Sequence, residues 1–130
     1  MKVIIAGSRS VKNRSVVEEA IQRSGFDVEE VVSGHARGVD RLGEQWANKQ
    51  NIPYHVYPAQ WDEHGNAAGV IRNDRMAGVA DALIAVWDGA SEGTKHMVTC
   101  MHREHEKPVF MMHSETGEEW RLNTQGSLFE

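Results

Sequence analysis

Three short glycine-bearing stretches hold the residues of this chain that are best suited to bind an anion. Each follows an apolar run, and they read Gly7-Ser8-Arg9, Gly34–Gly38 and Gly89–Thr94. Where a strand feeds a glycine-rich loop that opens a helix, free backbone N–H groups and the positive end of the helix dipole meet at one point. Arg9 and Arg37 add permanent planar cations. This chemistry fits a phosphate or another small anion.

The apolar runs before these loops predict strands of a parallel sheet. Val3–Ala6 and Ala82–Trp87 are continuously apolar, which is typical of strands buried on both faces. Four more strands are expected at Val28–Ser33, Ile52–Tyr57, Pro108–Met112 and, as a short edge strand, Glu118–Leu122. The alternation with helices predicts an α/β, Rossmann-like three-layer sandwich, with a mostly parallel sheet of about five strands and helices on both faces. One glycine loop alone is ordinary turn chemistry, but three at the carboxyl edge of one sheet favour an anion pocket.

Helical spacing predicts which residues face the core between the strands. A first helix, ended by Gly25, buries Val16, Val17, Ala20 and Ile21. A helix after the third glycine loop buries Thr94, Met97, Val98 and Met101. The stretch from Pro58 to Asn73 is too polar and irregular for a core element, so we expect a long functional loop there, followed by a helix to about Val79.

Bulk composition limits the classes of function. The chain has 130 residues and a formal net charge of -5, which suits one domain and argues against bulk electrostatic binding of nucleic acid. Its single cysteine, Cys100, excludes an internal disulfide. We find no secretion-signal pattern and no apolar run near the ~20 residues of a membrane span, so we expect a cytoplasmic protein with no membrane partner.

Several side chains outside the glycine loops have two interpretations. In the functional interpretation, Arg72 binds a phosphate and Asn73 binds a ribose or base. In the structural one, both residues only cap or flank the start of a helix. Asp40 holds a ribose hydroxyl, or complements the helix dipole. Trp61 is the better candidate for base stacking, whereas Trp87, at the end of a buried strand, is expected to pack in the core. Four residues of one helix, His96, Cys100, His102 and His105, do not predict a metal site, because we expect Cys100 to pack and the histidines to face water.

A resemblance to a known family rests on the combined order of these motifs over roughly residues 2–112. The motifs are Ala6–Arg9, Ser33–Asp40, Pro58–Trp61, Ala68–Asn73 with Met76, and the loop that ends in Gly93-Thr94. Together they resemble the SLOG superfamily, and most of all its small YspA-related branch found in bacteria and phages. The resemblance implies a Rossmann-like fold that binds nucleotides or NAD-derived ligands such as ADP-ribose. Its relatives include the "lonely guy" phosphoribohydrolases and DNA-processing protein A, which loads recombinase on single strands.

One departure from the superfamily concerns catalysis. The phosphoribohydrolases carry a Gly-Gly-x-Gly-Thr-x-x-Glu motif whose glutamate acts in N-glycosidic cleavage, and here Met97 stands where that glutamate would be. A methionine cannot transfer protons or stabilise an oxocarbenium ion. Hydrolysis by that route is therefore disfavoured, while binding through Gly93 and Thr94 is unaffected.

We expect a binding module for a small nucleotide or an NAD- or ADP-ribose-derived ligand, with no cofactor and no metal. The expected ligand-binding residues are Gly7, Ser8, Arg9, Gly34, His35, Arg37, Gly38, Asp40, Trp61, Arg72, Asn73, Gly89, Ser91, Gly93 and Thr94. Two alternatives stay open. One is an N-glycosidic hydrolase that uses Asp88, Glu92 or His35 as its acid or base, and the other is a DNA-metabolism accessory protein.

The expected domain covers residues 1–122, and residues 123–130 are expected to form a flexible tail. Gln125, Leu128 and Phe129 in this tail resemble the pentapeptide with which bacterial proteins dock on the DNA sliding clamp, or else the apolar pair folds back on the domain. Related domains often dimerise through helices, so a homodimer is a further expectation.

Overall fold

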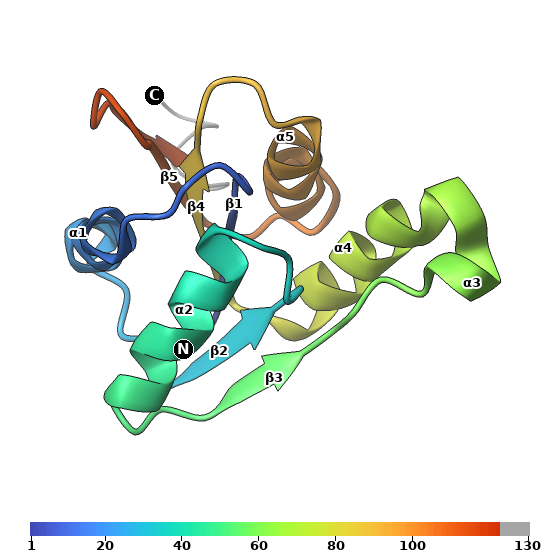
Figure 1. The fold of residues 1–130 in the computed structure, drawn as a ribbon, viewed down its shortest axis with the longest axis horizontal. Coiled ribbons are helices and arrows are strands. Elements are labelled where there is room, and N and C mark those ends of the chain that lie inside the picture. The colour runs from blue at the N-terminus through green and yellow to red at the C-terminus, as the bar shows by residue number, and fades with distance from the viewer. Residues whose placement is uncertain (123–130) are drawn as a thin grey trace.

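The computed structural model describes residues 1–122, and its centre is a six-stranded sheet (Figure 1). The strands are β1 (Lys2–Gly7), β2 (Glu30–Ser33), β3 (Tyr54–Val56), β4 (Ala82–Trp87), β5 (Val109–His113) and β6 (Glu119–Leu122). Their order is β3-β2-β1-β4-β5-β6; β1 to β5 are parallel and β6 pairs antiparallel with β5. This confirms the Rossmann-like α/β fold. The expected edge strand forms and makes the sheet six strands wide. The clamp-like residues Gln125, Leu128 and Phe129 lie outside the described residues.

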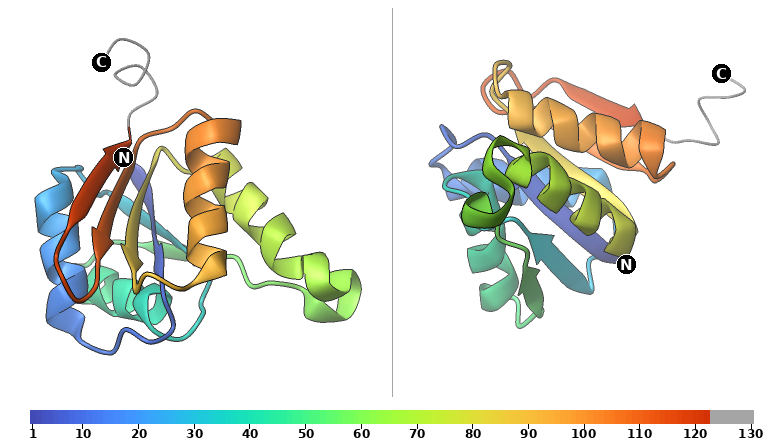
Figure 2. Two further views of the ribbon diagram at one scale, coloured as in Figure 1. Left: turned by 90° about the horizontal axis from the view of Figure 1, so that it is seen from above. Right: turned by 90° about the vertical axis from the view of Figure 1, so that its right-hand side faces the viewer.

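Helices cover both faces of the sheet, as Figures 1 and 2 show. The helical elements are α1 (Arg14–Ser24), α2 (Val39–Lys49), α3 (Trp61–His64), η1 (Gly65–Ala67), α4 (Ala68–Val79), α5 (Glu92–Thr99) and the π-helical η2 (Cys100–Glu104). Alternate residues of β1 pack on opposite faces: Val3 and Ile5 join the core beneath α1 and α2, while Ile4 and Ala6 join the core beneath α4 and α5. This alternation explains why the strand reads as continuously apolar.

Local capping explains where α1 begins and ends and where α5 begins. The Asn13 side chain accepts a hydrogen bond from Ser15 N at 3.0 Å and starts α1, and Gly25 ends it with a φ of 74°. The Ser91 hydroxyl accepts from Thr94 N and starts α5. The predicted stop at Gly25 is therefore confirmed.

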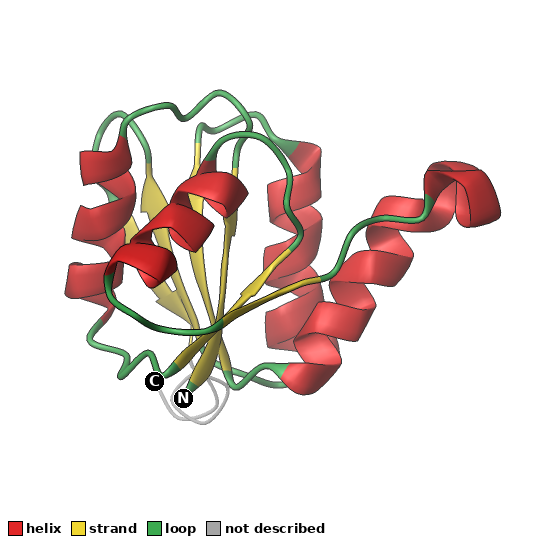
Figure 3. Ribbon diagram, turned by 60° about the horizontal axis from the view of Figure 1, so that its bottom comes forward, coloured by secondary structure: helices red, strands yellow, loops and turns green. Residues whose placement is uncertain are grey.

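The expectation of a long loop between Pro58 and Asn73 is wrong. Helix begins at Trp61 and continues through η1 into α4, which ends at Val79 as expected. In Figure 3, α3 and the start of α4 project from the body of the protein, away from the sheet. Because a projecting helix has little core to face, its sequence lacks the apolar periodicity by which a helix is recognised.

The order of the strands creates a switch point between β1 and β4. The chain leaves β1 toward one side of the sheet and β4 toward the other, so the loops after these two strands diverge at the carboxyl edge. Ligands of open α/β sheets bind in the crevice that such a divergence leaves. Within residues 1–122, no helix is long and apolar enough to cross a membrane.

Candidate functional site

A cavity of about 790 Å³ lies at the carboxyl ends of β1 and β4, where the strand order predicts a crevice. A second hollow of about 390 Å³ adjoins it. Both are bordered by the same four residues, Arg9, Ala36, Trp61 and Arg72, so they form two lobes of one cleft. Ligand pockets of small molecules have volumes in this range.

The cleft brings together most of the residues that the sequence predicts. The larger lobe is lined by Gly7, Arg9, Asp40, Trp61, Arg72, Asn73, Ser91, Gly93 and Thr94. The smaller lobe adds Gly34, His35 and Arg37. These residues come from the carboxyl ends of β1, β2 and β4 and the loops after them, from the first turns of α2 and α5, and from the helices α3 and α4.

Three predicted residues do not line the cleft; they stabilise the conformation of the loops instead. Ser8 is fully buried, and its hydroxyl accepts a hydrogen bond from Asp88 N at 2.9 Å. Gly38 has a φ of 82°, and a Cβ there would lie 2.4 Å from the Ser8 carbonyl oxygen. Gly89 has a φ of 89° and turns the chain beside His113. The glycine-rich loops therefore owe part of their composition to their own close packing.

Asp40 ties two of the loops together from the first turn of α2. Its carboxylate oxygens accept from Gly7 N and Ala36 N, both at 3.3 Å, and the residue is only 5% exposed. Burial raises the pKa of Asp40 to about 6, although the hydrogen bond from Ala36 and the charge of Arg72 act in the opposite direction. Asp40 also lines the larger lobe, so its position is compatible with a ribose hydroxyl as well as with a structural role.

Arg72 and Asn73 connect α4 to the loops across the cleft. Arg72 Nη1 donates to the Gly34 carbonyl oxygen at 2.8 Å, and its Nε donates to Asn73 Oδ1 at 3.1 Å. The Asn73 amide nitrogen in turn lies 3.0 Å from His96 Nδ1 on α5. Burial lowers the pKa of Arg72; the Asp40 carboxylate opposes this shift and the neighbouring Arg9 adds to it. A half-buried guanidinium beside a second arginine favours an anion in the cleft.

The smaller lobe has a strongly cationic wall. Four arginines line it, namely Arg9, Arg37, Arg41 and Arg72. Arg41 Nε donates to the His35 carbonyl oxygen, whereas Arg9 and Arg37 make no hydrogen bond or ion pair within residues 1–122. Two exposed guanidinium groups are thus available to a ligand at the border of the cleft.

His35 stands in this wall in a conformation that is uncommon for a residue with a side chain. Its φ is 61°, and its Nδ1 lies 2.9 Å from both carboxylate oxygens of Glu44. Glu44 is nearly buried and also accepts from the Ser33 hydroxyl at 2.6 Å. A carboxylate on Nδ1 orients an imidazole and leaves Nε2 as the second nitrogen for a partner.

The loop after β4 forms the opposite wall. Asp88 accepts from Ala90 N, Ser91 N and the Ser10 hydroxyl, and these bonds, that of Ala90 first, lower its pKa to about 2. Such a carboxylate stays ionised near neutral pH, which makes Asp88 unsuitable as a general acid. Met97 lines the same wall and is 2% exposed, so an apolar side chain stands where the phosphoribohydrolase motif has its glutamate.

The two tryptophans of interest have different surroundings. Trp61 on α3 is 54% exposed and borders both lobes, so its ring can receive a planar group. Trp87 donates from Nε1 to the Ser91 carbonyl oxygen and packs edge-on against His113 and Trp120. Trp87 therefore packs against its neighbours, but it is only half-buried and belongs to neither of the two core clusters, so the expected place in the core is wrong.

Sequence reasoning missed several lining residues: Ser10, Ala36, Arg41, Asn66, Val70, Met76 and His96. Arg41 follows Asp40 in the first turn of a predicted helix, so its proximity to the loop had a sequence signal. His96 meets Asn73 only because α4 and α5 lie side by side. The expectation that the histidines face water is wrong for His105, which bonds to Asp74, and for His102, whose Nδ1 is buried. His96 is half-buried and meets Asn73.

These features define an open, Rossmann-like α/β domain with a cleft at the switch point of its sheet. The chain belongs to the YspA, cpYpsA-related SLOG family, whose model, YAcAr, matches residues 1–64. It is similar to the Gene 61 protein of Mycobacterium phage D29, with 38% identity over 116 residues that cover 82% of this chain and 89% of that protein. The expected YspA-related branch is thereby confirmed.

The fold is similar to that of a solved structure, the X-ray structure of DNA processing protein A (DprA) from Streptococcus pneumoniae. The TM-score is 0.70 and the sequence identity is 17%, and the match covers 99% of this chain. This chain spans 61% of the length of that structure. At such low identity the likeness establishes a shared fold.

Proposed function

We propose that this protein binds a small nucleotide, or an NAD- or ADP-ribose-derived ligand, in the two-lobed cleft. The observation that carries the proposal is the contrast between the adjoining lobes. Arg9, Arg72 and the exposed indole of Trp61 lie at the border of both lobes. Beyond this border, the smaller lobe adds Arg37 and Arg41, whereas the larger lobe adds hydrogen-bonding and apolar side chains. A nucleotide has the same division between its phosphates and its nucleoside.

The cationic lobe suits the phosphate groups. Arg9 and Arg37 have guanidinium groups without a protein partner in residues 1–122, and Arg72 is held in place by Gly34 and Asn73. Guanidinium groups bind phosphate oxygens in bidentate pairs, and orientation before binding lowers the entropic cost.

The larger lobe suits a nucleoside. The Trp61 ring offers a stacking surface, and stacking of a base on an aromatic side chain contributes about 1–3 kcal/mol. Asp40 and Asn73 offer partners for sugar hydroxyls or base edges, while Met76 and Met97 form an apolar floor. Glycines and Thr94 allow close approach of the ligand to the start of α5.

Calorimetry with Arg37→Ala tests this proposal. The ligand panel is a nucleoside monophosphate, ADP-ribose, NAD and a single-stranded oligonucleotide. Loss of one charge-assisted contact weakens binding of the preferred nucleotide by roughly tenfold to a hundredfold. The matched control is Arg75→Ala, which removes the same charge from an exposed position on α4 that does not line either lobe. Absence of nucleotide binding, or equal weakening by both variants, overturns the proposal.

The oligonucleotide in the panel addresses the DNA-metabolism alternative. The similar structure comes from a protein named for DNA processing. A formal net charge of -5 opposes binding of a polyanion over a broad surface, although it does not oppose a small anion in an arginine-lined lobe. Binding of the oligonucleotide alone would favour a DNA accessory role over the nucleotide module.

A second candidate function, N-glycosidic hydrolysis, is favoured by the His35–Glu44 pair. With Met97 in the opposite wall, a proton carrier has to come from elsewhere, and the oriented imidazole of His35 borders the smaller lobe. Chromatography of nucleotides incubated with the protein tests this candidate. Released base that disappears with His35→Ala, while binding persists, supports it; the absence of released base excludes hydrolysis of the tested compounds.

A further inference from the structure

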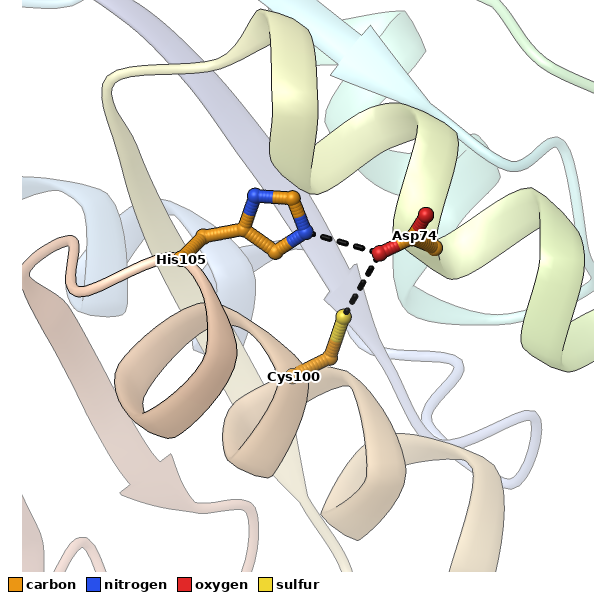
Figure 4. A group of neighbouring side chains, drawn as sticks. All are labelled: Asp74, Cys100 and His105. Atoms are coloured by element: carbon orange, nitrogen blue, oxygen red, sulfur yellow. Dashed lines mark hydrogen bonds and ion pairs between the residues drawn. The ribbon is translucent and has the colours of Figure 1, made fainter.

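A cluster of three potential metal ligands lies between α4 and the η2 turn, away from the cleft (Figure 4). His105 Nε2 is 2.8 Å from Asp74 Oδ1, and Cys100 Sγ is 3.9 Å from the same oxygen. All three ligand atoms lie within 4.8 Å of one another. None of these residues lines either lobe of the cleft.

The backbone brings Cys100 and His105 together in an unusual way. In a regular α-helix, residues five apart would be separated by about 140° around the axis. Here the chain forms the π-helical turn η2, and His105 N donates to the Cys100 carbonyl oxygen at 3.1 Å. The wider turn places both residues on the side that faces α4. Such turns are rare and are often found at functional sites.

The donor set selects among metals. A thiolate, an imidazole and a carboxylate together suit zinc, which binds sulfur, nitrogen and oxygen ligands in tetrahedral sites. The Cys100 thiol gives its proton to solvent when the Zn–S bond forms. Calcium and magnesium require oxygen ligands instead. From these atoms we infer that Asp74, Cys100 and His105 form a zinc site that clasps α4 to the end of the α5–η2 helix.

The geometry needs only small side-chain adjustments to hold the ion. Zinc at about 2.0–2.3 Å from each ligand separates the ligand atoms by roughly 3.3–3.8 Å, compared with 2.8 Å and 3.9 Å here. The ion would enter between Asp74 Oδ1 and His105 Nε2 and replace their hydrogen bond. Asp74 is exposed, so the ion has access from solvent, and the fourth position can be taken by water.

The proposed zinc site of Asp74, Cys100 and His105 lies next to residues that line the cleft. Asp74 follows Asn73, whose amide nitrogen meets His96 on α5 and lines the larger lobe. A metal that joins α4 to η2 therefore stabilises the wall formed by these two helices. The inference does not depend on the identity of the cleft ligand, because none of the three metal ligands touches the cleft.

Titration of the full chain with zinc chloride tests the site. One equivalent is expected to bind and to raise the melting temperature. Asp74→Asn, Cys100→Ser and His105→Gln are each expected to weaken zinc binding at least about tenfold. The matched control is His55→Gln, because His55 also contacts a carboxylate, Glu30, at 2.9 Å, but is not part of this cluster. This control is expected to bind zinc as the native protein does.

Cobalt provides a readout that separates a metal site from a mere contact between helices. Co²⁺ in place of zinc is expected to give a thiolate charge-transfer band that Cys100→Ser abolishes. If Cys100→Ser does not fold, Asp74→Asn at its exposed position still reports on the metal. Substoichiometric binding, absence of the thiolate band, or equal weakening by His55→Gln overturns the inference.

Discussion

Asp40 shows how a single buried carboxyl can connect the stability of a site to pH. Its pKa is raised to about 6 by burial, so the folded state holds this proton over a pH range in which the unfolded chain has already released it. Its charged neighbours are Arg72 on α4, which favours the ionised form, and Glu44 on its own helix, which opposes it. Stability from this group is fully present below a pH of about 4 and is lost as the pH rises through about 6.

Asp40→Asn is expected to reduce the pH dependence of stability. Between about pH 5 and about pH 7.5, the free energy of unfolding of the native protein should fall by about 1 kcal/mol more than that of the variant. Urea denaturation at the two pH values measures both slopes. All other side chains are the same in both proteins, so the comparison isolates Asp40. Asp88, whose pKa is lowered to about 2, stays ionised throughout. Parallel slopes would contradict the assignment of a raised pKa to Asp40.

At the scale of elements, the start of α2 is built by close contact between two loops. Gly38 precedes the helix with a positive φ, and a Cβ on it would lie only 2.4 Å from the Ser8 carbonyl oxygen. Gly93 in the first turn of α5 differs, because a Cβ there would have no atom within 4 Å. Two glycines that look alike in the sequence thus have different physical roles.

Gly38→Ala is expected to destabilise the protein by roughly 2–4 kcal/mol, because it adds both backbone strain and a clash with backbone. Gly93→Ala is the matched control and is expected to leave the free energy of unfolding unchanged or to raise it by up to about 1 kcal/mol. Chemical denaturation compares the two variants. If Gly93→Ala weakens nucleotide binding without loss of stability, this result supports the proposal that the ligand lies close to the start of α5. Equal stability of the two variants would show that the loops yield to the added methyl group.

At the scale of the whole molecule, the sheet order and the distribution of charge act together. An acidic chain gathers four arginines around one lobe of a cleft, at the switch point between β1 and β4. Segregation of this kind favours a small anion over a long polyanion, because the cationic surface is local. The similarity in fold to DNA processing protein A concerns the scaffold, and scaffolds of this type host different functions.

By itself, the amino-acid sequence determined the layers of the fold and most of the cleft. Continuous apolar strands and glycine-rich turns are local patterns, and parallel pairing necessarily brings the ends of such strands to one edge. Arg9, Arg37 and Thr94 could therefore be assigned to the cleft from their positions after strands. Local patterns also predicted the helix stop at Gly25, which depends only on the conformation of one residue.

Only the tertiary structure decided which way the loop residues face and which distant residues meet. Ser8 points into the protein, where its hydroxyl accepts a hydrogen bond from Asp88 N. The helices around Trp61 form although their sequence has no apolar periodicity from which a helix could be predicted. The contact of His105 with Asp74, like that of His96 with Asn73, depends on the packing of helices that are far apart in the chain. Such contacts leave no periodic signal, because each rests on a single side chain placed by the whole fold.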